Sequence, residues 1–381
     1  MARKHRVRNE AVAWIGGAPA SFEEAAAAAA DILAASGQPL IAGLGADVDG
    51  ARAAIALAER IGGVVDHMHS AALFRDLDCQ RETGVMITTP GEARVRADVV
   101  LLVGEGLWKT WPALNERLLR LPARPHGGDV ARRILWLAPG TKAKIPEFDG
   151  AVQVVAAGLG ATLAANLAAL RARVKNRPVA RAELEPGALD TVATTLRGAK
   201  FGVAVWTAAC LGALEIEMVN GLVRDLNETT RFSTLPLAAP DNGVGVLAAC
   251  GWMTGFPART GFGSGAPRHD PWRFDADRLV ASNETDCVLW ISAFGAPSPA
   301  WPDGILAVAL CDRATRLKAT PKVRIEVARP GVDHDAVLHC LDTGTLVAVT
   351  ATSPRDGVAP SVAQALARIA ARLPDASASA C

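Results

Sequence analysis

The fold of the chain is indicated most clearly by residues 40–65, which read LIAGLGADVDGARAAIALAERIGGVV. The apolar run at 40–42 predicts a buried strand that ends in the glycine-rich residues 43–45. A helix is predicted over 50–61, because two glycines follow it, and the valines at 64–65 predict a short second strand. A strand, a crossover helix and another strand favour a parallel sheet.

The same alternation continues on both sides of this stretch. A helix is predicted over residues 21–36, because Ser21 and Glu24 match a capping box and Gly37 suits the C′ position. The other predicted strands are 99–103, 134–137, 152–155, 202–206, 234–237, 288–292, 307–311 and 323–327, and the other predicted helices are 113–121, 161–174, 188–197, 214–227 and 361–373. Apolar strands separated by helices predict an α/β fold with parallel sheets covered on both faces. Residues 173–186 read as a surface connection, and 375–381 as a disordered tail.

Composition limits the class of protein. The 381 residues suggest two or three domains. Forty basic and 39 acidic residues give no long-range field for nucleic acid or an anionic membrane. No stretch of about 18 strongly apolar residues predicts a transmembrane helix. The basic start, residues 3–8, precedes no apolar segment and reads as a solvated tail, so we expect a cytoplasmic protein. The seven cysteines form no C-x-x-C pair, so neither a zinc ribbon nor a cluster-binding run is encoded.

Three glycine pairs follow predicted strands: Gly43-x-Gly45, Gly104-x-Gly106 and Gly158-x-Gly160. Ligands bind beyond the carboxyl ends of strands in doubly wound folds, and glycine lets the backbone approach a phosphate. No pair completes the G-x-G-x-x-G pattern, and the chain has no Walker A lysine motif. Tight turns between strand and helix are therefore the favoured interpretation.

Other polar clusters are weaker candidates for a site. His67 and His69 form an H-x-H pair after a strand, but no further ligand accompanies them at a recognised spacing. A second cluster, which we interpret as a solvated turn before a strand, contains Asp333, His334, Asp335, His339 and Cys340. The third is a glycine-rich loop that could contact a ligand or a neighbouring subunit, or serve as a flexible connection; it contains Gly261, Gly263, Gly265 and Arg268-His269-Asp270.

Several long stretches resemble the catalytic B subunit of formylmethanofuran dehydrogenase, a relative of the molybdopterin oxidoreductases. Residues 46–66 are similar to its segment in which a helix precedes a "V-I-D" strand. Residues 88–106, TTPGEARVRADVVLLVGEG, and 226–260, LNETTRFSTLPLAAPDNGVGVLAACGWMTGFPART, match two further phrases of the family. The resemblance covers much of residues 38–312. It implies a molybdopterin-oxidoreductase-like fold of two Rossmann-like lobes with mostly parallel sheets.

The chain departs from this family at each element that would hold its cofactors. No cysteine occurs before Cys79, so the family's N-terminal cluster motif has no counterpart. The metal-ligating cysteine would fall near Ala72, whose methyl group cannot bind a metal. The family's "D-P-R-x-T" aligns with Ala138 and residues 139–141, where both charged groups are missing.

This pattern is similar to the B subunits of the formyltransferase/hydrolase complex of methylotrophic bacteria. The resemblance implies a complex that moves a formyl group from formyl-tetrahydromethanopterin to a methanofuran-type carrier and then hydrolyses it to formate. It implies amidohydrolase-like, formyltransferase and gamma-type partner subunits, with the carrier as a further candidate contact. It also implies that this chain is a structural subunit with no catalytic, cofactor-binding or metal-binding residue and no cofactor. The alternatives are a pterin-dependent dehydrogenase subunit with unusual metal ligands and a stand-alone Rossmann enzyme.

The resemblance also suggests a domain plan. Residues 1–36 would form an N-terminal segment and helix, 37–70 plus 239–330 a discontinuous first lobe, and 71–238 a second lobe. Residues 331–381 would supply the C-terminal strands, helix and tail. We further expect the chain to aggregate when expressed alone. The strand ends near Gly43, Gly45, Gly104, Gly106 and Ala72 should be filled by bulkier neighbours, with Met68, Leu73, Phe74 and Trp136 as the candidates.

Overall fold

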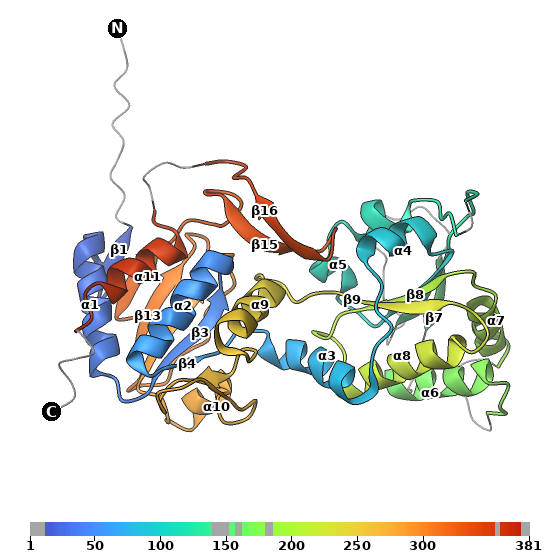
Figure 1. Ribbon diagram of the computed structural model, residues 1–381, viewed down its shortest axis with the longest axis horizontal. Helices are drawn as coiled ribbons and strands as arrows, with labels where there is room; N and C mark the ends of the chain where they lie inside the picture. Colours follow the sequence, from blue (N-terminus) through green and yellow to red (C-terminus); the bar gives the residue numbers. More distant parts are fainter. Residues whose placement is uncertain are drawn as a thin grey trace, which may run out of the picture. The chain divides into compact units, whose positions relative to one another are not determined.

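The computed structural model describes residues 12–125, 127–138, 152–156, 162–179, 186–354 and 359–374. The chain divides into two compact units. Unit 1 comprises Met1–Ser70, Asp241–His339 and Leu346–Cys381, and unit 2 comprises Ala71–Pro240 and Cys340–Thr345. Unit 1 is therefore built from segments that flank unit 2 in the sequence, and each unit contains its own sheet (Figure 1).

Unit 1 contains a nine-stranded sheet in the order β11-β10-β4-β3-β12-β13-β14-β1-β2. Its five central strands are parallel: β4 (Val64–Val65), β3 (Pro39–Gly45), β12 (Cys287–Ser292), β13 (Leu306–Cys311) and β14 (Val323–Glu326). Antiparallel edge strands flank them: β1 (Ala13–Ile15), β2 (Ala18–Ala20), β10 (Thr260–Gly261) and β11 (Arg268–His269). The expectation of a parallel sheet is thus correct for the centre and wrong for the edges. The edge strands are only two or three residues long, too short to give an alternating pattern in the sequence.

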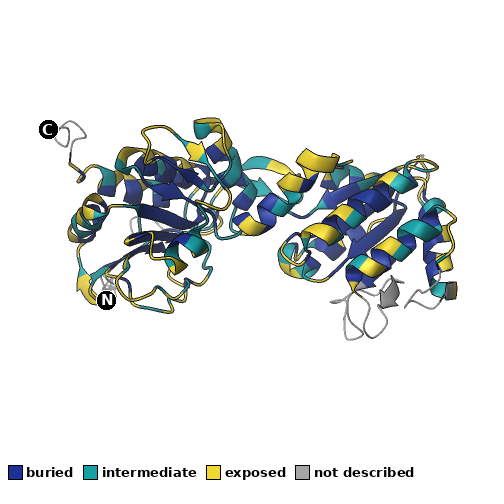
Figure 2. Cartoon of the chain, turned by 90° about the horizontal axis from the view of Figure 1, so that it is seen from below, coloured by how far each residue is buried: buried dark blue, intermediate teal, exposed yellow. Residues whose placement is uncertain are grey.

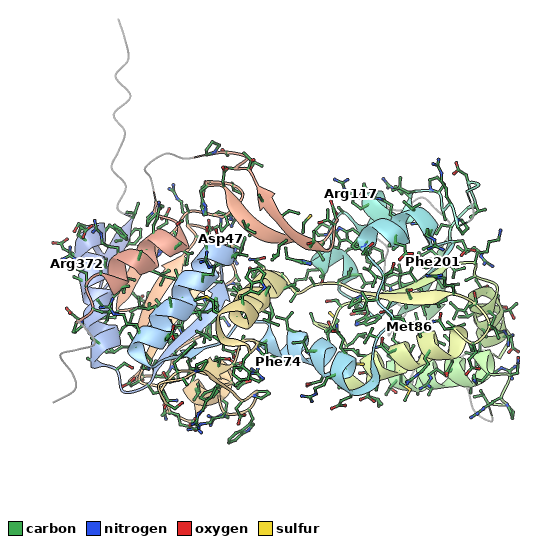
Figure 3. All side chains as sticks on the ribbon, viewed as in Figure 1. Asp47, Phe74, Met86, Arg117, Phe201 and Arg372 are labelled. Carbon is green, nitrogen blue, oxygen red and sulfur yellow. The ribbon has the colours of Figure 1, made fainter. Side chains whose placement is uncertain are left out.

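Helices cover both faces of this sheet (Figure 1). One face packs against α1 (Phe22–Ala35), α2 (Val48–Ile61), α9 (Gly243–Thr254) and α11 (Val362–Ala370), and the other packs against α10 (Ala276–Ala281). The capping box of Ser21 and Glu24 starts α1 as predicted, and Asp47 caps α2 (Figure 3). Gly37 takes the C′ position after α1 as predicted, although the chain leaves the helix at Ser36 in an extended conformation and not in a left-handed one. The Asp286 carboxylate then accepts from the Gly37 amide (2.8 Å).

Unit 2 contains a five-stranded sheet in the order β7-β6-β5-β8-β9, and all of its strand pairs are parallel. Its strands are β5 (Val99–Val103), β6 (Arg133–Ala138), β7 (Val152–Ala156), β8 (Gly202–Trp206) and β9 (Phe232–Pro236). One face packs against α6 (Leu163–Val174), α7 (Pro186–Arg197) and α8 (Ala213–Leu226). The other face carries α4 (Pro90–Arg96), α5 (Leu107–Thr110) and the π-helical turn η1 (Asn115–Leu119). Figure 2 shows the strands of both sheets buried beneath exposed outer helix faces.

Several further parts of the fold differ from the predicted elements. The predicted helix over 113–121 is a π-helical turn, closed by a hydrogen bond from the Arg120 amide to the Asn115 carbonyl (2.9 Å). The sequence did not predict α3 (Ser70–Thr83), which follows β4, and it did not predict α4, α5, α9 or α10. The strands expected within residues 331–381 form a separate two-stranded sheet of β15 (Ala336–Cys340) and β16 (Thr345–Val349). In the described part of the chain, no helix combines the length and apolar character needed to cross a membrane.

The two parallel sheets follow different winding orders. Numbered along the chain, the central strands of unit 1 run 2-1-3-4-5, whereas those of unit 2 run 3-2-1-4-5. Both orders are doubly wound, and each reverses direction at one topological switch point, where such folds bind ligands. That point lies between β3 and β12 in unit 1 and between β5 and β8 in unit 2. A ligand site in either unit is therefore expected at these strand ends.

Candidate functional site

The switch point of unit 1 is occupied by side chains of the same unit. A Cβ added at Gly45 would lie 3.1 Å from the Cε atom of Met68 and 3.4 Å from the Cβ of Asp241. Gly43, which has a φ of 72°, lies against the Trp290 indole, 2.9 Å from where its own Cβ would be. Close packing therefore explains both glycines. This agrees with the interpretation of the pair as a tight turn between strand and helix.

Two residues with positive φ cover the loop after β3. Asp241 and Asn242 have φ values of 55° and 58°, a conformation that costs about 1 kcal/mol or more for residues other than glycine. The Asn242 side chain donates to the Ala46 carbonyl (2.8 Å) and accepts from the His339 amide (2.8 Å). It therefore fixes the strand-end loop to His339 of β15 within unit 1.

The H-x-H pair is part of the same hydrogen-bond network. His69 Nε2 donates to the Asp241 carboxylate (2.9 Å), and the His69 side chain is 30% exposed. His67 is buried, and its Nδ1 accepts from the His69 amide (3.1 Å). The Nε2 of His67 therefore carries the hydrogen and donates to the Asp241 carbonyl (3.2 Å). Since both ring nitrogens of His67 are used within the protein, this ring cannot bind a metal without losing a hydrogen bond.

Burial sets the protonation of this histidine. Desolvation, together with the charge of the neighbouring His69, lowers the pKa of His67 to about 4, and Asp241 opposes the shift. His67 is therefore neutral at physiological pH and acts as a fixed hydrogen-bonding group. Within the described residues, no group of three or more histidine, cysteine, aspartate or glutamate side chains is arranged to hold a metal ion.

A buried carboxylate lies directly before the H-x-H pair. Burial raises the pKa of Asp66 to about 6, while a hydrogen bond from Ser70 and the charge of Arg259 oppose the shift. Asp66 accepts from the backbone amides of His67 (2.9 Å) and Ala276 (2.9 Å), and the second amide belongs to the start of α10. Arg259 bridges Asp66 (3.4 Å) and Asp275. The cluster fixes the end of β4 against α10, and the sequence did not predict it, because Arg259 and Asp275 are remote from Asp66 in the chain.

The switch point of unit 2 is filled by apolar contact. A Cβ at Gly106 (φ 76°) would lie 2.5 Å from the Cys210 sulfur, and one at Gly104 (φ 75°) would lie 2.9 Å from Leu211 Cδ2. Trp136 Nε1 donates to the Gly104 carbonyl (2.9 Å). The loop after β8 thus lies on the glycine turn after β5 and takes the space that a nucleotide phosphate would need.

A second, half-buried carboxylate, that of Asp76, lies on α3 and contacts β8 through Trp206. Burial raises the pKa of Asp76 to about 6, opposed by a hydrogen bond from Trp206 and by the charge of Arg75. The Trp206 indole donates to Asp76 over 3.4 Å, a long hydrogen bond. Arg75 itself donates to the Leu211 carbonyl (2.6 Å), so α3 helps to fix the loop that fills the switch point.

The remaining candidate residues from the sequence either take part in local turns and loops or lie outside the described residues. Asp333 and Asp335 accept from the backbone amides of Arg329 (2.9 Å) and Ala351 (2.8 Å), and His334 donates to the Asp335 carbonyl (2.7 Å). The cluster is therefore a turn that leads into β15, as the sequence suggested. The glycine-rich loop at 261–265 lines a cavity. The third glycine pair, Gly158 and Gly160, the basic start at 3–8, the tail at 375–381 and residues 139–141 lie outside the described part of the chain.

A pterin cofactor with a tungsten or molybdenum centre does not fit the residues present. The segment 67–78 offers no cysteine, and the residue nearest the expected ligand position is the buried Ala72. Both strand-end glycine turns are occupied by protein atoms at van der Waals distance or closer to the position of an added Cβ. We therefore derive no chemistry through such a group.

Comparison with known proteins points to one kind of subunit. The chain is 35% identical over 345 residues to the B subunit of the formyltransferase/hydrolase complex of Methylorubrum extorquens, a match that covers 90% of this chain and 92% of that protein. It is 26% identical over 245 residues to the B subunit of the tungsten-containing formylmethanofuran dehydrogenase 2 of Methanocaldococcus jannaschii, covering 63% of this chain and 56% of that protein. The corresponding protein of Methanococcus maripaludis is 23% identical over 291 residues, covering 71% of this chain and 64% of that protein. No protein-family model matches the chain.

The same similarity is seen in three dimensions. The fold superposes with a TM-score of 0.83 on a chain in the crystal structure of the formyltransferase/hydrolase complex of Methylorubrum extorquens with methylofuran. The two chains are 34% identical, and the match covers 94% of this chain and 98% of that one. The similarity therefore extends over both units rather than over one of them.

Proposed function

Because the chain belongs to the family of B subunits of the formyltransferase/hydrolase complex, we propose that it is a structural, non-catalytic subunit of such a complex. The observation that carries the proposal is the filling of both switch points by the protein's own atoms. Met68, Trp290 and Asp241 lie at the strand-end glycines of unit 1, and Cys210 and Leu211 lie at those of unit 2. A doubly wound fold whose ligand positions are both filled can serve as a rigid structural body but offers no active site at those positions.

The proposal includes the reaction of the whole complex. Such a complex moves a formyl group from formyl-tetrahydromethanopterin to a methanofuran-type carrier and hydrolyses it to formate, in the cytoplasm. The partners would be amidohydrolase-like, formyltransferase and gamma-type subunits. This chain would keep the molybdopterin-oxidoreductase-like fold and the two-lobed domain plan without the cofactors.

Exposed apolar side chains of unit 1 support a role in assembly. Trp252 is 64% exposed and Trp272 is 71% exposed, and Met253 and Phe256 are exposed near the end of α9. Large exposed apolar groups are typical of protein–protein interfaces. We therefore expect the chain to aggregate when expressed alone. A stable, monodisperse monomer by light scattering would contradict that expectation.

The decisive experiment is purification of the native complex from its own cells. The expected result is co-purification of the three partner subunits, without stoichiometric tungsten, molybdenum or iron bound by this chain. Deletion of the chain should prevent assembly. In the assembled complex, a His69→Ala or Asp241→Asn variant should leave the turnover numbers of transfer and hydrolysis unchanged, because neither residue would touch a reacting group.

The alternative is a pterin-dependent dehydrogenase subunit with unusual metal ligands, which the similarity to the two tungsten-containing enzymes favours. Near-stoichiometric tungsten or molybdenum in the purified chain would establish it and overturn the structural role. Loss of turnover in the His69 variant, with assembly intact, would also overturn the structural role. It would not by itself support the metal-dependent dehydrogenase.

A further inference from the structure

The glycine-rich loop at residues 261–265 forms part of a cavity that the proposed function does not use. The cavity has a volume of 340 Å³. Its lining includes Gly37 and Gln38, which precede β3, and Gly62, which precedes β4. Because these residues lie at the amino ends of parallel strands, the cavity is at the opposite edge of the sheet from the switch point of unit 1.

The loop contributes Gly261, Gly263 and Ser264 to the lining of the cavity. A Cβ at Gly261 would lie 2.5 Å from the Phe274 ring, so this glycine lets the ring pack directly against the strand. The Phe262 amide donates to the Gly63 carbonyl (2.9 Å), and the Gly265 amide donates to the Phe262 carbonyl (2.9 Å). Between them, the amides of Gly263 and Ser264 have no acceptor among the residues that the structure describes. Successive free amides in a tight turn form a concavity that attracts anions.

Two arginines line the same cavity. Arg268 and Arg273 have no carboxylate within 4.0 Å in the described ranges, whereas Arg259, Arg278 and Arg329 of the same unit are all paired with acids. The Arg273 guanidinium lies 5.5 Å from the centre of the Phe274 ring. The Arg273 charge also acts at longer range on the carboxylates of Asp270 and Glu284. Guanidinium groups without a directly bound carboxylate are well suited to planar or tetrahedral oxyanions.

One acidic residue also lines the cavity. Glu284 is bound by the Arg278 guanidinium, with Nη2 to Oε2 at 3.0 Å, so its charge is already neutralised. The other charged lining residues are Arg268 and Arg273, and Asp270, which is not part of the lining, interacts electrostatically with Arg273. The cavity therefore combines two positive side chains with two unused amide donors.

We propose that this cavity binds the oxyanion group, a phosphate or a carboxylate, of a small molecule. The two guanidinium groups would supply charge-assisted hydrogen bonds, and the amides of Gly263 and Ser264 would bind the remaining oxygens. The lining residues of this site differ from the exposed apolar residues that support the assembly role, although Arg273 follows Trp272 in the chain. A failure of binding would leave the structural role untouched.

The test is isothermal titration of the full chain, in the complex with which it purifies. The two probes are inorganic phosphate and citrate, with ionic strength held constant by sodium chloride. We expect saturable binding of at least one probe at one site per chain. Saturation by phosphate alone would identify a phosphate ligand, and saturation by citrate alone a carboxylate ligand. Absence of saturation by both would overturn the proposal.

Substitution separates a built site from general charge attraction. The Arg268→Gln/Arg273→Gln double variant should bind roughly tenfold more weakly or worse, since each charge-assisted hydrogen bond contributes to affinity. The control is Arg52→Gln/Arg372→Gln, which removes the same net charge from the exposed surface of unit 1. Equal weakening in the control would overturn the proposal. The single variant Arg268→Gln, at an exposed position, gives the same test should the double variant not fold.

Discussion

The two units close their switch points in different ways. In unit 1 the strand ends are held by a polar network of His67, His69, Asp241 and Asn242, with the buried pair Asp66–Arg259 beside it. In unit 2 the corresponding glycine turn is covered by Cys210 and Leu211. A polar closure depends on the pairing and protonation of buried groups, whereas an apolar closure depends on shape. The units should therefore respond differently to changes of charge, volume and pH.

The largest expected effect is the loss of Arg259. An Arg259→Met variant leaves the buried Asp66 and the half-buried Asp275 without their shared counter-charge, which should destabilise unit 1 by about 3–5 kcal/mol. Denaturant unfolding gives the free energy, and hydrogen exchange by mass spectrometry shows which unit opens. The control is Arg52→Met, which removes a pair with side chains 60% and 67% exposed and should cost about 0–1 kcal/mol. Equal effects would show that the buried pair contributes no more than a surface one.

The next effect concerns the glycines of the two turns. Gly106→Ala places a Cβ 2.5 Å from the Cys210 sulfur at a φ of 76°, and should destabilise unit 2 by about 1–3 kcal/mol. Gly45→Ala meets the flexible end of Met68 at 3.1 Å and has no positive φ, so we expect less than about 1 kcal/mol. Thermal unfolding measures both. A Gly106→Ala/Cys210→Ala double variant should recover only the steric part, and full recovery would show that the backbone conformation is not strained.

The pH dependence of unit 2 should reveal Asp76. Its pKa is raised from 3.8 to about 6, so the folded state holds the proton more tightly than the unfolded state, and stability is lost as the pH rises through that window. Asp76→Asn keeps an acceptor for Trp206 and removes the titration. The free energy of unfolding of the variant, relative to that of the wild type, should therefore rise by roughly 1–3 kcal/mol between pH 4 and pH 7. Denaturant unfolding across that range measures the difference, and a constant difference would contradict the raised pKa.

The pH dependence of His67 in unit 1 should have the opposite sign. Its pKa is lowered from 6.5 to about 4, so its contribution to stability is present above pH 6.5 and is lost as the pH falls towards 4. A His67→Gln variant should be less stable than the wild type at pH 7, and the gap should narrow on acidification. The same unfolding series measures it. A gap that widens towards pH 4 would show that the ring gains rather than loses stability on protonation.

The smallest expected effect is at Cys210. Its side chain is exposed, so Cys210→Ala should change the free energy of unfolding by no more than about 0.5 kcal/mol. A thiol reagent should modify it in the folded chain. Burial raises the pKa of both Cys250 and Cys287 to about 12, so these thiols should react only after unfolding. Peptide mapping after labelling gives the order, and early labelling of Cys250 would show that unit 1 opens locally.

Periodicity was enough to find the centre of each sheet. The apolar runs at 64–65, 99–103 and 202–206 match β4, β5 and β8, because strands buried on both faces must be apolar throughout. The start of α1 was also predictable, since the capping box of Ser21 and Glu24 depends only on neighbours in the sequence.

Elements whose character depends on remote partners were not predictable. The edge strands β10 and β11 are too short for a pattern, and α3 carries too mixed a sequence to show an apolar stripe. Gly37 follows the end of α1, as its residue type predicts. Its hydrogen-bond partner could not be predicted, because the Asp286 carboxylate that accepts from its amide lies far along the chain.

By itself, the sequence determined the α/β class, the buried strands and the positions of the strand-end glycines, because all three follow from spacing along the chain. It also determined that no cysteine is available near residue 72. Only the tertiary structure decided what fills the strand ends, because Met68, Asp241 and Trp290 reach Gly43 and Gly45 from distant segments. The same holds for the protonation of Asp66 and His67, since a pKa is set by burial and by neighbouring charges, and both come from folding.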